Sequence, residues 1–210
     1  LVALAERGLY VNSHVEMQAS IDAFLDVYES INKERPIKGL HWSFSHLDQV
    51  SEAQLERMKK LGMSAQIHSR PLIQGALMHK AHGDKAWDMP PFRRVQDSGI
   101  LWGLGSDATA VTTSNPFYTL ALAVTGKMIG GQPVNRQTIT REEALIAHTR
   151  SDAFIIFQEA NLGSLSPGKY ADLVVLDRDY FAVPVDEIAR IRPVMTMVGG
   201  RIVHPASRTE

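Results

Sequence analysis

Residues 40–68, LHWSFSHLDQVSEAQLERMKKLGMSAQIH, contain a complete strand–helix–strand pattern. The apolar-rich runs 40–45 and 63–67 have the length and composition of strands that are buried on both faces. Between them, the capping-box pattern SEAQ at 51–54 begins a helix, and Gly62 is the residue type that ends one. Two strands joined by a helix are expected to pair in parallel, so this stretch predicts an α/β fold.

The same alternation continues on both sides of this stretch. Further strands are predicted at 9–13 and 100–104, and long loops at 75–89 and 126–134. Helices are predicted over 17–31, 51–61, 90–98, 115–124 and 140–148. Four strand–helix units indicate a parallel barrel or a doubly wound sheet.

The last quarter of the chain has a different character. It is rich in turn residues and contains an apolar run at 171–176. A hairpin is predicted from 195–198 and 202–204, because Gly199-Gly200 separates them. We therefore predict a boundary near residue 160.

Composition excludes several classes of protein. Among 210 residues, 22 Lys and Arg stand against 23 Asp and Glu, so the net charge of -1 argues against a nucleic-acid partner. Cysteine is absent, which excludes disulfides and thiolate metal sites. No apolar run approaches the ~20 residues of a membrane span. A cytoplasmic protein with a small-molecule substrate is expected, and a homo-oligomer is left open.

Groups that can bind a metal follow all four predicted strands. His14, His46 and His68 come after the first three strands, and Asp107 follows the fourth. Such positions meet at one mouth if the sheet curves into a barrel. Neutral imidazoles and a carboxylate are ligands that Zn²⁺ prefers. By contrast, we expect His79 and His82 to be a solvated pair in a loop.

Several motifs resemble those of metal-dependent amidohydrolases of the amidohydrolase family 3 branch. They are His14 followed by DAFLDVYE at 22–29, His46 in SHLDQV with KLG at 60–62, and GSDA at 105–108. The tail is also similar, with GSLSPGKYADLVVLDRD at 163–179 and VGGRIV at 198–203. The chain thus resembles the C-terminal half of such an enzyme over nearly its whole length.

The resemblance implies a fold, a site and a reaction. Residues 1–160 would be strands five to eight of a (β/α)8 TIM barrel, and 161–210 part of a small β-sandwich domain. The partner would be the N-terminal half of the barrel. His14, His46 and Asp107 would bind one or two divalent ions, most often Zn²⁺, with Asp107 also moving the proton and His68 contacting substrate. A metal-activated water would hydrolyse a non-peptide C–N bond of an amide or formamide-like substrate.

Two alternatives remain open from the sequence. The enzyme could be a deaminase or a cyclic-amide hydrolase of the same superfamily. It could also be a non-catalytic remnant that serves as a scaffold, because the first-strand His-x-His of the family is not found in this chain.

Overall fold

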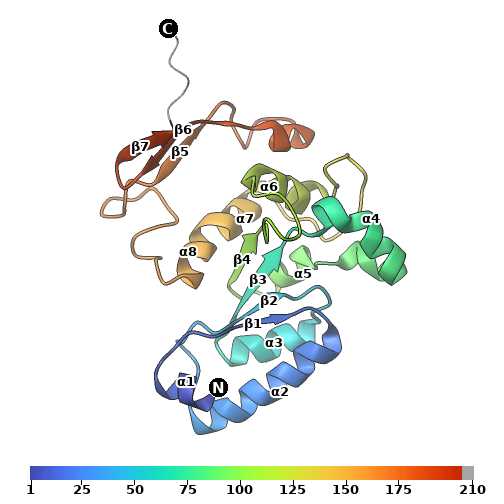
Figure 1. Ribbon diagram of the computed structural model, residues 1–210, viewed down its shortest axis with the longest axis vertical. Coiled ribbons are helices and arrows are strands. Elements are labelled where there is room, and N and C mark those ends of the chain that lie inside the picture. The colour runs from blue at the N-terminus through green and yellow to red at the C-terminus, as the bar shows by residue number, and fades with distance from the viewer. Residues whose placement is uncertain (205–210) are drawn as a thin grey trace.

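The computed structural model describes residues 1–204 and contains a four-stranded parallel sheet in the order β1-β2-β3-β4 (Figure 1). The strands are β1 (Asn12–Val15), β2 (Ser43–His46), β3 (Ser64–His68) and β4 (Trp102–Gly105). All four predicted strands are present, and the mixed α/β fold is confirmed. Each strand begins later than predicted. At β2 the reason is His41, whose φ of 55° is left-handed, so extended backbone starts only after it.

Helices connect consecutive strands, as the alternation predicts. Both predicted capping boxes form, with the Ser51 hydroxyl accepting from the Gln54 N–H and the Thr140 hydroxyl from the Glu143 N–H. In Figure 1, α2 and α3 lie together on one side of β1 and β2. The helices are α1 (Val2–Glu6), α2 (Gln18–Glu34), α3 (Glu52–Lys60), α5 (Phe92–Asp97), α6 (Pro116–Thr125), α7 (Arg141–Ile146) and α8 (Asp152–Ile155).

The predicted loop at 75–89 is wrong. This segment belongs to α4 (Pro71–His82) and to the 3-10 helix η1 (Gly83–Asp88). Gly75 suggested a loop, but it lies inside the helix. A glycine is needed at this position because a Cβ there would lie 2.7 Å from Val134. His79 therefore lies on a helix as well, and its Nε2–H donates to the Val134 carbonyl over 2.9 Å. Residues 126–134 do form a loop, as predicted.

The face of the sheet toward α2 is apolar and tightly packed. Phe44 and Trp42 are fully buried, and their ring centroids lie 5.2 and 5.0 Å from that of Tyr28 in α2. The Tyr28 hydroxyl bonds to Ser13 of β1 over 2.6 Å. Each large side chain contributes about 1.5–3 kcal/mol when it is fully buried. This aromatic cluster therefore attaches α2 to the first two strands.

The tail forms a separate antiparallel sheet of β5 (Leu173–Leu176), β6 (Pro193–Val198) and β7 (Arg201–His204). Gly199 and Gly200 join β6 to β7 with φ of 56° and 77°, so the predicted hairpin is confirmed. The 3-10 helix η3 (Val185–Arg190) packs against α6 and connects this sheet to the rest of the molecule. The boundary near residue 160 stays a prediction.

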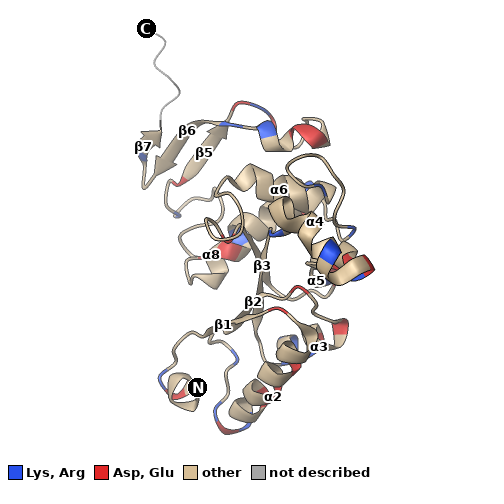
Figure 2. Ribbon diagram, turned by 45° about the vertical axis from the view of Figure 1, so that its right-hand side comes forward, with Lys and Arg blue, Asp and Glu red and all other residues tan. Residues whose placement is uncertain are grey.

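Charged side chains lie on the helices and connections rather than on the parallel sheet (Figure 2). The four strands β1 to β4 contain no Lys, Arg, Asp or Glu. Lys and Arg segments are interspersed with Asp and Glu segments. Within residues 1–204, no helix has both the length and the apolarity that crossing a bilayer requires.

Candidate metal centre

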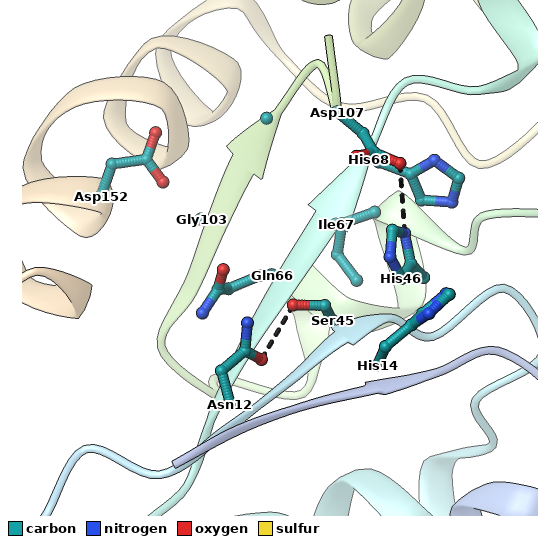
Figure 3. Close-up of a pocket in the computed structure, with 11 residues that line it drawn as sticks. Asn12, His14, Ser45, His46, Gln66, Ile67, His68, Gly103, Asp107 and Asp152 are labelled. Atoms are coloured by element: carbon teal, nitrogen blue, oxygen red, sulfur yellow. Dashed lines mark hydrogen bonds and ion pairs between the residues drawn. The ribbon is translucent and has the colours of Figure 1, made fainter. Parts of the chain in front are cut away.

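The second face of the parallel sheet forms the floor of a pocket of about 410 Å³. Because side chains alternate along a strand, the residues opposite the apolar face are polar or small. The pocket is lined by Asn12, His14, Ser45, His46, Gln66, Ile67, His68, Gly103, Gly105, Asp107 and Asp152 (Figure 3). The strand register places these positions side by side across the sheet, since His14 pairs with Ser45 and Ser45 with Gln66.

His46 reaches the pocket through an unusual backbone conformation. It pairs with Val15, a buried core residue, so regular alternation would turn its side chain toward the helices. Instead its φ is 80° and that of Leu47 is 55°. This left-handed turn places the His46 imidazole between those of His14 and His68, with ring centroids 4.0 and 4.5 Å away.

All four predicted site residues lie in this one pocket. Potential ligand atoms of His46, His68 and Asp107 lie within 4.8 Å of one another, and so do those of His14, Glu16 and His46. The His46 Nδ1 atom is 3.9 Å from Asp107 Oδ2 (Figure 3). Whether His14, His46, Asp107 and His68 have the roles that the resemblance implies stays a prediction.

The residues fit a divalent metal ion. The Nδ1 atoms of His46 and His68 are buried and have no hydrogen-bond partner among the described residues. A buried polar atom without a partner costs about 1–3 kcal/mol, which a ligand in the pocket would offset. Burial, together with the neighbouring imidazoles of His68 and His14, lowers the pKa of His46 to about 4. His46 is therefore neutral near pH 7, which is the form that binds metals.

An ion-pair network that sequence reasoning missed supports these histidines. Arg70 pairs with Glu16 through Nη2 and with Asp48 through Nη1, the latter over 3.2 Å. Glu16 also accepts from His14 Nε2 over 3.2 Å, and Asp48 accepts from His68 Nε2 over 3.1 Å. The hydrogen bond from Arg70 holds the pKa of Glu16 at about 2, against the opposing effect of burial.

A spacing pattern could have revealed this network. Glu16, Asp48 and Arg70 each lie two residues after a strand-end histidine. A charged side chain repeated at that offset after three parallel strands predicts charges that meet above one edge of the sheet. The pairing between them depends on the curvature of the sheet, which the spacing does not contain.

Asp152 is a second missed residue, and it lies at the β4 side of the pocket. It follows a π-helical segment, η2 (Ala147–Ser151), that interrupts the predicted helix at 140–148. Burial raises the pKa of Asp152 to about 7. Its side chain lies over Gly103, where a Cβ would approach Asp152 Oδ1 to 2.1 Å. A glycine in β4 is therefore what admits this carboxyl group to the pocket.

Comparison with known proteins identifies the family of this chain. The model of amidohydrolase family 3, described as the amidohydrolase family, matches residues 1–204. The chain belongs to the amidohydrolase family. Within it, the chain is 29% identical over 216 residues to the protein LONG AFTER FAR-RED 3 of Arabidopsis thaliana, covering 97% of this chain and 36% of that protein. It is 26% identical over 205 residues to the N-substituted formamide deformylase of Arthrobacter pascens, covering 95% and 37%.

Solved structures show the same amidohydrolase fold. An adenosine deaminase from Xanthomonas campestris with bound zinc superposes with a TM-score of 0.67 at 16% identity. The superposition covers 97% of this chain and 47% of that one. The chain thus spans less than half the length of these relatives.

Proposed function

We propose that this amidohydrolase chain carries part of the active site of a metal-dependent hydrolase of non-peptide C–N bonds. Amides and formamide-like molecules are the proposed substrates, and the pocket of about 410 Å³ suits a small molecule. One observation carries the proposal: imidazoles and a carboxylate from different strand ends converge in one pocket, where two buried imidazole nitrogens find no hydrogen-bond partner among the residues that the structure describes. The formamide deformylase among the relatives supports this substrate class.

His14, His46 and Asp107 are the residues that would hold one or two divalent ions, with Zn²⁺ favoured by the donor set. A bound divalent ion lowers the pKa of a water toward ~7 and polarises a carbonyl oxygen. His46 is neutral and held in place between two other imidazoles, so it needs no proton loss or large movement to act as a ligand. His14 lies in β1, where pairing with β2 holds its backbone.

Asp107 is the proposed proton carrier. It follows β4 and lines the pocket, and its side chain is 37% exposed. Its carboxylate would accept a proton from the water and return it to the leaving nitrogen. The backbone of Asp107 has a left-handed conformation, with a φ of 54°. The same carboxylate faces His46, so one side chain can serve the ion and the proton.

We further propose that the parallel sheet is half of a (β/α)8 barrel. Its strands follow one another in chain order, as barrel strands do. No strand among residues 1–204 pairs with the outer edge of β1 or β4. The remaining strands, and the other half of the site, would come from a second barrel half. The three-stranded sheet would be part of the small β-sandwich domain.

A substrate panel tests the proposed reaction. We expect the complete enzyme to release formate or carboxylate with an amine from N-substituted formamides and amides, and to lose this activity when a chelator removes the metal. Asp107→Asn should lower kcat by about 10²–10⁴-fold. Asp84→Asn, an exposed carboxylate in η1, is the matched control and should leave kcat unchanged.

Other results would favour the alternatives. Release of ammonia from amino-substituted rings would indicate a deaminase, and ring opening without a released amine would indicate a cyclic-amide hydrolase. If the enzyme contains no metal and Asp107→Asn changes nothing, the non-catalytic scaffold is the better description.

A further inference from the structure

We propose that His68 is a metal ligand, so that His46, His68 and Asp107 form a three-residue divalent cation site within this chain. The proposal rests on the function proposed above and adds a ligand from β3 to the set implied by the family resemblance. The ligand atoms of these three residues lie within 4.8 Å of one another. Three protein ligands with a fourth position left for water are the usual arrangement of a catalytic zinc.

The hydrogen bonds of His68 leave one ring nitrogen ready to bind. Its Nε2–H donates to Asp48 Oδ1 over 3.1 Å, which leaves Nδ1 as the ring nitrogen that can offer a lone pair to a metal ion. That Nδ1 atom is buried and has no hydrogen-bond partner within residues 1–204. A histidine that donates one ring N–H to a carboxylate and offers the other nitrogen is typical of metal ligands.

Burial strengthens this interpretation. The His68 side chain is 4% exposed and that of Asp48 is 2% exposed. Arg70 compensates the buried Asp48 carboxylate through a 3.2 Å ion pair, and Glu16 holds Arg70 from the other side. The imidazole is therefore fixed in orientation without any substrate present. Such a fixed orientation suits a ligand better than a contact that must adapt to substrates.

His46 and Asp107 complete the site from the neighbouring strands. The His46 ring lies edge-on to that of His68, with centroids 4.5 Å apart. Its own buried Nδ1 atom likewise has no hydrogen-bond partner in the described part of the chain. Asp107 Oδ2 is 3.9 Å from that Nδ1 atom. In Figure 3 the three side chains face one another at the ends of β2, β3 and β4.

Cobalt titration of the complete, metal-free enzyme tests the assignment without relying on turnover. We expect His68→Gln to weaken Co²⁺ binding by more than ~100-fold and to change the visible Co²⁺ absorption, because a ligand is lost. Asp48→Asn should weaken it by about 10–100-fold, as losses of such carboxylate partners do. His204→Gln, an exposed histidine in β7, is the matched control and should bind Co²⁺ like the wild type.

The outcomes separate this proposal from the proposed function. If His68→Gln keeps wild-type Co²⁺ affinity and absorption while KM rises, His68 contacts substrate instead and the proposal fails alone. If the wild type takes up no Co²⁺, or His46→Gln has no effect on uptake, the proposed function fails too. Thermal melting of the metal-free variants shows whether they fold. If His68→Gln does not fold, an unchanged affinity of Asp48→Asn overturns the proposal.

Discussion

The two faces of the same four strands differ in almost every physical property. One face is apolar and buried against helices, with Phe44, Ala65 and Leu104 fully buried. The other face is polar or small and lines a pocket of about 410 Å³. Because neighbouring residues alternate between faces, each strand contributes to folding and to chemistry at once. The packed face holds the strands in place so that histidines at their ends can stay close together.

The largest expected effect concerns the two outer edges of the parallel sheet. Among residues 1–204 no strand pairs with the outer edge of β1 or β4, and strand edges left without a partner strand promote association. We expect the 210-residue chain, produced by itself, to elute from size-exclusion chromatography as dimers or larger assemblies. A monomer that unfolds cooperatively would contradict the proposal that this sheet is half of a barrel.

Substitutions on opposite faces of β2 should differ in how much they lower the free energy of unfolding. Phe44→Ala is expected to lower the free energy of unfolding by about 3–5 kcal/mol, because it leaves a cavity among buried rings. Ser45→Ala removes only a 2.8 Å hydrogen bond to Asn12 and should cost about 0.5–1.5 kcal/mol. Urea unfolding of the complete enzyme measures both. Equal losses would mean that the pocket face contributes to stability as much as the packed face.

A smaller effect is expected where the pocket face of β4 meets α8. In Gly103→Ala the added Cβ would lie 2.1 Å from Asp152 Oδ1 and 2.7 Å from Ile155, so a loss of about 1–3 kcal/mol should follow. Gly105→Ala is the matched control, since no atom of the described residues lies within 4 Å of its Cβ position. Thermal melting compares the two, and identical values would show that Asp152 does not need the space.

The smallest effect belongs to the helix layer behind the packed face. Hydrogen bonds from Arg93 hold the pKa of Glu143 at about 2, below its usual 4.5, although burial opposes them. A lowered carboxyl pKa contributes stability above pH 4.5, and this contribution is lost as the pH falls toward 2. Glu143→Gln keeps the capping pattern and should lower the free energy of unfolding by about 1 kcal/mol at pH 7. The difference in the free energy of unfolding between this variant and the wild type should disappear near pH 2.

Glu142→Gln is the control for that measurement. Glu142 is an exposed neighbour in the first turn of α7. Urea unfolding at several pH values should show little change for this variant. The same pH dependence in both variants would assign the effect to the first turn of α7 rather than to the pair with Arg93.

Much of the fold could be predicted from local pattern. The strand-end positions of His14, His46, His68 and Asp107 follow from apolar runs of known length. The helix α4 could not be predicted in this way, because Gly75 is required by the close approach of Val134, which is distant in sequence. The sequence alone does not distinguish a glycine that close packing requires from a glycine that a turn requires.

The sequence by itself determined the α/β class, the order of strands and helices, and the residues at the strand ends. Those depend on periodicity, caps and turn residues, which act over a few positions. Only the tertiary structure decided that His46 turns into the pocket and that Arg70 joins Glu16 to Asp48. It also decided that Nδ1 of His68 is buried without a hydrogen-bond partner among residues 1–204. These features depend on backbone dihedrals and on contacts between strands about 20–50 residues apart, because a curved sheet brings such strands together.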